Sequence, residues 1–296
     1  MRKRRAARHR QRRERKPQAG QMVLWDGSQH RWLGERGPQL CLMGAIDDAT
    51  GELLGGAHFV KQECAAGYLK LVLEMAGQQG LPCSIYMDHH GSLVRNDDHW
   101  SAGELARGKQ HPTQVGRALE QLGIRVIRAL TPQAKGRVER LWGTLQDRLV
   151  SELRLAGASD QAAANAVLKK FIASFNRRFA KPAAVEPSAW RQLNDIDVIR
   201  ACSLSYETKV QNDNTVRMQG MVIDIAPGAE GRSYAHCRVA LHQLLDGSWR
   251  VYYDDQLLAT AAASGSKELR ALKGTNKARY RTERHAAALQ PNVIGL

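Results

Sequence analysis

Three carboxylates in this sequence stand where divalent-metal chemistry could take place. Asp26 and Asp88 each end a predicted strand, and Glu139 lies in a helix predicted over 131–150. A sheet packed against that helix would bring the three side chains together as an all-oxygen site, which Mg²⁺ and Mn²⁺ prefer. Three carboxylates can hold two ions about 3.5–4 Å apart, one for the attacking oxygen and one for the leaving oxygen of a phosphodiester.

The helix that carries Glu139 is predicted from its apolar residues. Thr131 can cap it and Pro132 suits its first position. The apolar stripe consists of Val138, Leu141, Trp142, Leu145 and Leu149. Glu139 lies about 60° from Trp142 around the helix, at the rim of this stripe, so it can meet the ends of adjacent strands. Trp142 and Trp25 are interpreted as core residues.

The remaining elements of the first part are short and follow one another closely. Strands are predicted over 22–26, 39–47, 52–60, 83–88 and 123–130, and helices over 64–79, from 113 onward and over 160–179. The second and third strands form a hairpin through the turn "DDATG", where Asp47 and Asp48 are interpreted as structural. The strand over 123–130 is expected to be buried, and 91–112 is expected to be a loop near the site.

The chain becomes all-β after about residue 200. Alternating segments over 215–225, 236–245 and 248–260 predict strands, and Asp246-Gly247 predicts a hairpin turn. These strands favour a small β-barrel over 200–262. The basic stretch 263–296 has no strong period and is expected to be a flexible tail.

The charge of the chain favours a polyanionic partner, with double-stranded DNA as the first candidate. The formal net charge is +15 and the pI is about 9.9. The first sixteen residues hold ten Lys or Arg against the single Glu14, a net charge of +9. Residues 1–19 are therefore expected to be a disordered arm or linker that orders on DNA phosphates, although a solubilising tail is the alternative.

Cysteine usage and hydropathy limit the cellular setting. The five cysteines are scattered and never spaced as Cys-x-x-Cys, which favours a reducing compartment and argues against a structural zinc. No apolar run approaches the roughly 18 residues of a membrane span. We expect a cytoplasmic, nucleoid-associated protein without a membrane partner.

Four segments together resemble the catalytic core of DDE transposases and retroviral integrases, and they are most similar to ISNCY-type insertion-sequence transposases. The segments are "DGSQHRWL", "DDATG", "YMDHHG" and "TPQAKGRVERLWGTLQDRLVSELRLAG". The resemblance spans about 21–190, over half the chain. Pro132, Gln133, Gly136 and Glu139 resemble the loop and helix start that carry the third carboxylate in that superfamily.

The resemblance implies a ribonuclease-H-like mixed α/β sheet flanked by helices over 20–190, followed by a small β-barrel. It implies that Asp26, Asp88 and Glu139 are the catalytic triad and bind two Mg²⁺ or Mn²⁺ ions. The implied reaction is metal-dependent DNA strand cleavage and strand transfer by at least a dimer. Relatives usually carry helix-turn-helix domains before the core, and this chain is expected to lack them.

Several residues near the triad have predicted or open roles. By position, Lys135, Arg137 and Arg140 are predicted DNA contacts, although a solvated charged face is the alternative. His30, Gln133 and Asn176 could approach substrate, with no role assigned to them.

Other interpretations of the same residues remain open. Asp26-Gly27 could be a turn, and Glu139 could be a surface ion-pair partner of Arg140 or Lys135. Asp88, His89 and His90, with Asp98 and His99, could form a zinc or copper site, but no third ligand stands at helical or Cys-x-x-Cys spacing. At the level of function, the alternatives are a catalytically idle DNA-binding remnant and a host nuclease of the same fold.

If the basic arm contacts about six phosphates, deleting 1–19 should reduce the slope of log K against log salt by about five units, because each contact releases counterions. Fluorescence anisotropy with labelled duplex DNA over a salt series measures this slope. An unchanged slope would mean that the arm does not contact DNA.

Overall fold

The computed structural model of the protein describes residues 13–87, 91–93, 95, 100–128, 136–218, 220–263 and 269–271, without the side chains of 107, 137 and 138. The chain divides into two compact units. The first comprises Met1–Glu63, Lys70–His90 and Leu119–Ile196, and the second comprises Cys64–Leu69, Gly91–Ala118 and Asp197–Leu296. Each unit is described by itself.

The first unit is built on a mixed five-stranded sheet with the order β3-β2-β1-β4-β5. Its strands are β1 (Val23–His30), β2 (Leu40–Asp47), β3 (His58–Val60), β4 (Ser84–Met87) and β5 (Arg125–Arg128). The central strand β1 pairs antiparallel with β2 and parallel with β4, while β3 and β5 form the edges. This arrangement confirms the predicted mixed sheet.

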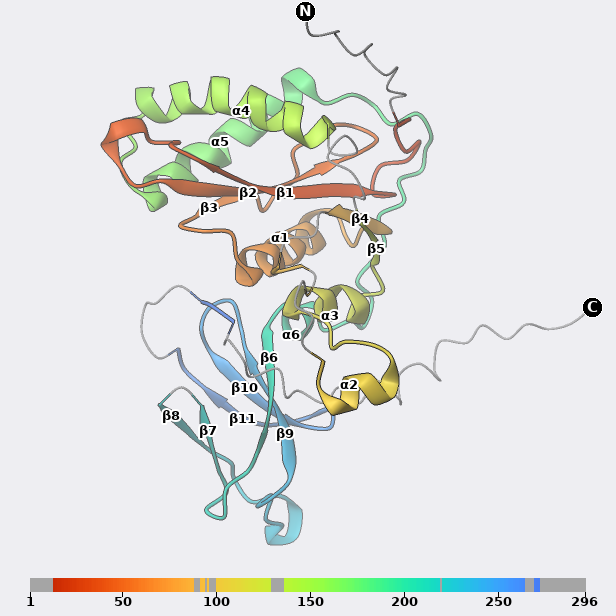
Figure 1. Ribbon diagram of the computed structural model, residues 1–296, viewed down its shortest axis with the longest axis vertical. Coiled ribbons are helices and arrows are strands. Elements are labelled where there is room, and N and C mark those ends of the chain that lie inside the picture. Colours follow the sequence, from red (N-terminus) through yellow and green to blue (C-terminus); the bar gives the residue numbers. More distant parts are fainter. Residues whose placement is uncertain are drawn as a thin grey trace, which may run out of the picture. The chain divides into compact units, whose positions relative to one another are not determined.

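The helices flank this sheet. They are α1 (Ala65–Gln78), α4 (Gly136–Leu155) and α5 (Gln161–Phe179), while most of α3 (Gln114–Gln121) belongs to the second unit. Figure 1 shows α4 and α5 on one side of the sheet and α1 on the other. None of the helices in the described part of the chain combines the length and the apolar content of a membrane span.

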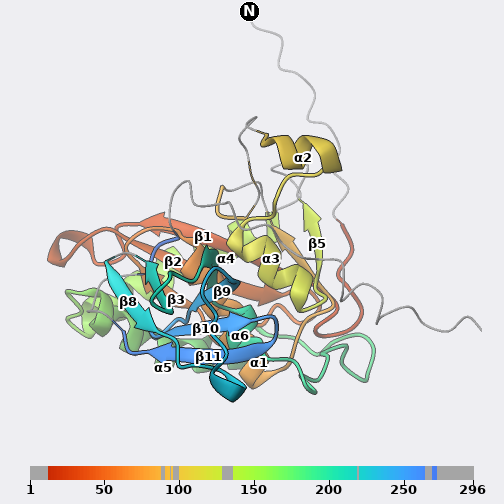
Figure 2. The ribbon, with the colours of Figure 1, turned by 90° about the horizontal axis from the view of Figure 1, so that it is seen from below.

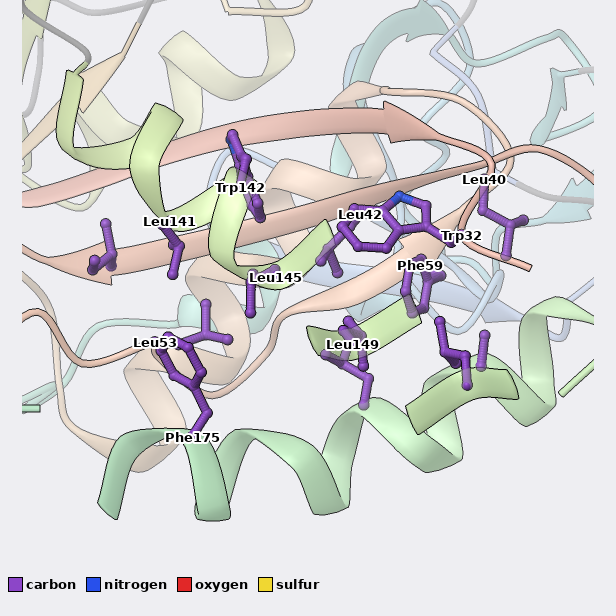
Figure 3. Close-up of a cluster of buried hydrophobic side chains, with 14 of the residues drawn as sticks. Trp32, Leu40, Leu42, Leu53, Phe59, Leu141, Trp142, Leu145, Leu149 and Phe175 are labelled. Atoms are coloured by element: carbon purple, nitrogen blue, oxygen red, sulfur yellow. The ribbon is translucent and has the colours of Figure 1, made fainter. Parts of the chain in front are cut away.

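The apolar stripe of α4 is buried in a core between α4, α5 and the sheet, as the sequence predicts. Trp142, Leu145 and Leu149 of α4 are buried and point toward the sheet and α5 (Figure 3). Phe175 reaches the same cluster from α5. The predicted core positions of Trp142 and Trp25 are confirmed, with exposed fractions of 7% and 1%.

Helix α5 also satisfies backbone groups at the β3 edge of the sheet. The Asn165 side chain accepts a hydrogen bond from the Phe59 N–H at 2.7 Å and donates to its carbonyl at 3.4 Å. Asn176 makes the same pair of bonds with Leu53, at 2.9 and 2.8 Å. These bonds shield the edge from pairing with another chain. They also give Asn176, one of the residues considered near substrate, a structural role.

The two aspartates of the turn after β2 are structural, as predicted, and they also bind the chain segment that precedes β1. Asp47 accepts bonds from the backbone N–H groups of Ala49 and Thr50 and from that of Gly20 at 2.7 Å. Asp48 pairs with the Arg13 guanidinium at 2.6 Å. Residues 13–20 are thus attached to the first unit, in contrast to the disordered arm expected over 1–19, because buried carboxylates bind them. Residues 1–12 lie outside the described residues.

Strand β5 differs from the buried strand that was expected. Arg125 and Arg128 are exposed, and Val126 and Ile127 are half-buried. Its place at the edge of the sheet explains this exposure, because among the described residues only β4 pairs with it.

The second unit contains two open antiparallel sheets. One has the order β11-β10-β9-β6, and β7 pairs with β8 in the other. The bounds are β6 (Leu204–Lys209), β7 (Thr215–Met218), β8 (Met221–Asp224), β9 (Arg238–Gln243), β10 (Trp249–Tyr253) and β11 (Gln256–Ala261). Strands β9, β10 and β11 run side by side (Figure 2). The predicted Asp246-Gly247 hairpin turn is confirmed, but the barrel is not: in the described residues neither sheet closes on itself.

The segment expected to be a loop over 91–112 contains a short helix, α2 (Ala102–Arg107). Ser101 and Glu104 form a capping box, the signal that the sequence analysis missed. The buried Glu104 carboxylate accepts bonds from the Ser101 hydroxyl and the His111 N–H at 2.8 Å each, and it pairs with Arg95. Burial by itself would raise the pKa of Glu104, but these hydrogen bonds and the Arg95 charge lower it from 4.5 to about 2.

Replacing Glu104 by Gln should lower the melting temperature at pH 7 by about 5 °C, because buried donors lose a charged acceptor. A folded-state pKa below the unfolded value means that the carboxylate stabilises the protein above about pH 4.5. The stabilisation is lost as the pH falls toward 2. The difference between wild type and Glu104→Gln in thermal melts should therefore shrink below pH 4.5.

Glu230→Gln is the control for this experiment, because Glu230 is exposed in the same unit. It should melt like the wild type at every pH. A Glu104→Gln variant as stable as the wild type at pH 7 would contradict the role of this carboxylate.

Candidate active site

Asp26 lies in the middle of the central strand of the first unit. The prediction that its strand ends at this residue is wrong, because β1 continues to His30 through regular pairing with β2. The preceding Trp25 is buried, whereas Asp26 is half-buried. Successive side chains alternate between the faces of a strand, so Asp26 is directed toward the face that α4 covers.

A hydrogen bond joins Asp26 to α4. The indole N–H of Trp142 donates to Oδ2 of Asp26 at 3.2 Å. Gly44 stands opposite Asp26 in the β1–β2 pair, and a Cβ at Gly44 would lie 2.7 Å from the Trp142 ring. A glycine inside a strand often marks a close approach of another group, and here it leaves room for the indole.

A second hydrogen bond runs beside the first. Nε2 of Gln146 donates to Oγ of Ser28 at 3.3 Å. Trp142 and Gln146 are about 6 Å apart along the helix axis, and Asp26 and Ser28 are about 6.6 Å apart along the strand. The two bonds follow the same order in both elements, so α4 lies alongside β1 and runs in the same direction.

Glu139 lies in the first turn of α4, and its side chain is exposed. It precedes Trp142 by three residues, which is about 4.5 Å along the helix axis and about 60° around it. The helix that contacts Asp26 therefore presents Glu139 one turn before that contact. A carboxylate in the first turn also interacts favourably with the helix dipole.

Asp88 lies outside the described residues, so its place in the triad remains a prediction. The strand that leads to it, β4, runs parallel to β1, with Ile85 opposite Val23 and Tyr86 opposite Leu24. Met87 is the last residue of β4. The described chain thus reaches the residue before Asp88 on the strand that pairs with the Asp26 strand.

The donors of this site suit a hard cation, because Asp26 and Glu139 offer only carboxylate oxygens. Within the described residues, no three His, Cys, Asp or Glu side chains gather closely enough to hold a metal ion by themselves. Asp88, which is predicted to complete the ligand set, lies outside these residues. The zinc or copper alternative rests on His89, His90, Asp98 and His99, which also lie outside the described residues.

The residues predicted to contact DNA are described only in part. Arg140 is exposed on α4. Lys135 and the side chain of Arg137 lie outside the described residues, as does Gln133. His30 packs edge-on against Trp32, with ring centroids 5.3 Å apart.

Trp142 and Gly44 are the site residues that the sequence analysis missed. Trp142 was assigned to the core alone, yet a buried indole N–H usually needs an acceptor. Gly44 stands inside a strand of otherwise mostly apolar side chains. Both signals are visible in the sequence, but neither identifies the partner, because the partner depends on the pairing of β1 with β2 and on the position of α4.

Comparison with known proteins relates the chain to transposases. It is 42% identical over 175 residues to "Putative transposase y4bF" of Sinorhizobium fredii, a match that covers 59% of this chain and 37% of that protein. It is 36% identical over 167 residues to "Transposase for insertion sequence IS1202" of Streptococcus pneumoniae, covering 56% and 34%. These matches confirm the resemblance to transposases. The chain spans about a third of the length of these relatives, and no family model matches it.

Solved structures with a similar arrangement come from retroviral integrases. The HTLV-2 integrase catalytic core domain in complex with magnesium matches 56% of this chain and 92% of its own, with 14% identity and a TM-score of 0.39. The simian T-cell lymphotropic virus intasome in complex with a PP2A regulatory subunit matches 88% and 86%, with 14% identity and a TM-score of 0.42. At these values the likeness carries no information about function.

Proposed function

We propose that this chain carries the catalytic core of a DDE transposase, which cuts DNA strands and joins them to a target in a metal-dependent reaction. The observation that carries the proposal is the contact between α4 and β1, where Trp142 bonds to Asp26 one helical turn after Glu139. The similarity to transposases over 175 residues supports the same assignment.

Asp26, Asp88 and Glu139 are the proposed metal ligands. Asp26 comes from the central strand, Asp88 follows the neighbouring parallel strand, and Glu139 comes from the first turn of α4. Two bound Mg²⁺ or Mn²⁺ ions would activate the attacking oxygen and stabilise the leaving oxygen of a phosphodiester. The three carboxylates would hold these ions in position, and none of them would form a covalent bond to DNA.

The proposed reaction has two phosphoryl-transfer steps. In the first, a water molecule loses a proton and its oxygen bonds to the phosphorus at a transposon end. The bond from phosphorus to the 3′ oxygen breaks, and the 3′ oxygen takes up a proton. In the second, the freed 3′-hydroxyl attacks a phosphodiester of the target DNA, loses its proton and displaces a 3′ oxygen there. Each step exchanges one ester or water oxygen for another, so neither needs an oxidant or a reductant.

The proposed substrate is double-stranded DNA, both transposon ends and target. A net charge of +15 supports this substrate, because cationic side chains neutralise phosphates and release counterions. Lys135, Arg137 and Arg140 remain the proposed contacts beside the triad. Pairing two DNA ends implies at least a dimer.

The test is a disintegration assay, which needs no recognition of transposon ends. The purified chain is incubated with branched DNA that carries joined ends, in Mg²⁺ or Mn²⁺, and strand breakage is followed on denaturing gels. Glu139→Gln and Asp26→Asn should each reduce the rate by about 1000-fold or more, because each removes a charged ligand of the proposed ions.

Asp147→Asn is the matched control. Asp147 is exposed on the same helix, about 12 Å from Glu139 along the axis, and this variant should cut DNA at the wild-type rate. A Glu139→Gln variant with full activity would overturn the assignment of the triad. A wild-type chain that binds DNA but cuts it with neither metal would favour the idle DNA-binding remnant.

A further inference from the structure

We propose that Trp142 is a positioning residue that orients the Asp26 carboxylate for metal binding and ties it to the helix that carries Glu139. This inference rests on the proposed function of the site. It goes further by giving a role to a residue outside the carboxylate triad.

The chemistry of the contact supports this role. The indole N–H is a donor only, and it contacts Oδ2 of Asp26 at 3.2 Å. The terminal torsion of an aspartate is broad and roughly two-fold, so a donor on one oxygen favours one orientation of the carboxylate. Oδ1 is then turned away from the indole.

The surroundings of the ring keep the donor in place. Trp142 is 7% exposed and belongs to the core cluster with its neighbours Leu141 and Leu145. On the side of β2 the ring lies close to Gly44, where a Cβ would be only 2.7 Å from it. A side chain in a close-packed core cannot tilt without moving its neighbours, so the direction of the N–H is set by the core.

The Trp142 ring also links the positions of Asp26 and Glu139. Glu139 lies in the preceding turn of α4, and Asp26 bonds to the ring itself. A shift of α4 along β1 would therefore move Glu139 and break the Asp26 bond together. Trp142 thus couples the strand ligand to the helix ligand.

A nearby bond provides the matched control. Gln146 and Ser28 join the same helix to the same strand one turn further on, at 3.3 Å, without a carboxylate. Gln146→Ala removes a helix–strand bond of similar length. If Trp142 acted only as structural support, loss of either bond would have the same kind of effect.

The variants that test the role are Trp142→Phe, which keeps an aromatic ring but removes the N–H, and Gly44→Ala, which keeps Trp142 and displaces its ring. Binding of Mn²⁺ to the protein without DNA is measured by calorimetry, and the Mg²⁺ concentration for half-maximal strand breakage is measured with branched DNA. Both variants should weaken Mn²⁺ binding about tenfold and raise the half-maximal Mg²⁺ concentration by a similar factor, as expected for loss of a hydrogen bond to a charged group.

Gln146→Ala should leave both metal measurements within about twofold of the wild type, since its bond does not reach Asp26. Should Trp142→Phe fail to fold, Trp142 is replaced by benzothienylalanine, which keeps the two-ring shape and exchanges the N–H for sulfur. Folding of each variant is checked by circular dichroism.

The outcomes separate this inference from the proposed function. Active wild type together with unchanged metal dependence in folded Trp142→Phe would overturn the positioning role and leave the triad intact. An equal loss of metal affinity in Gln146→Ala would also overturn it. A wild-type protein that neither binds Mn²⁺ nor cuts DNA would contradict the proposed function itself.

Discussion

The packing of α4 against β1 is the constraint on which the rest of the candidate site depends. Asp26 lies on the central strand of the sheet and Glu139 lies on a helix more than a hundred residues later. The two elements meet because Trp142 and the leucines of α4 bury their apolar surface against the sheet and α5. The hydrophobic effect is non-directional, so it brings α4 to the sheet but does not by itself determine the contact register. The Trp142–Asp26 bond and the space that Gly44 leaves for the indole supply that specificity.

Polar side chains around the α4–β1 contact attach the neighbouring segments to the sheet. Asn165 and Asn176 on α5 bond to the backbone of Phe59 and Leu53, so α5 is held to the sheet beyond its apolar contacts. Asp47 and Asp48 hold the chain segment that leads into β1. These side chains satisfy backbone groups and charges that would be costly to leave unpaired, and each of them is remote in sequence from its partner.

Much of this structure could be predicted from the sequence, because apolar spacing and turn residues determine helices, strands and turns locally. The apolar spacing of Leu141, Trp142, Leu145 and Leu149 predicted α4 and its buried face, and Asp246-Gly247 predicted a hairpin turn. Most of the predictions that failed concern features that depend on distant parts of the chain; helix α2 is the exception, because its capping box is a local signal. The length of β1 beyond Asp26 is set by its pairing with β2, and the exposure of β5 is set by its place at the sheet edge. The two open sheets of the second unit depend on strand pairing that no local sequence pattern specifies. The Asp26–Trp142 bond belongs to this class, since it joins residues 116 positions apart.

The proposal that Asp26 and Glu139 bind the same catalytic metal centre is tested most directly by anomalous diffraction from crystals of the protein soaked in Mn²⁺. We expect anomalous peaks in contact with the carboxylates of Asp26 and Glu139, and their loss in crystals of Asp26→Asn. Wild-type crystals without Mn²⁺ at these carboxylates, from protein that cuts DNA in Mn²⁺ solution, would contradict it.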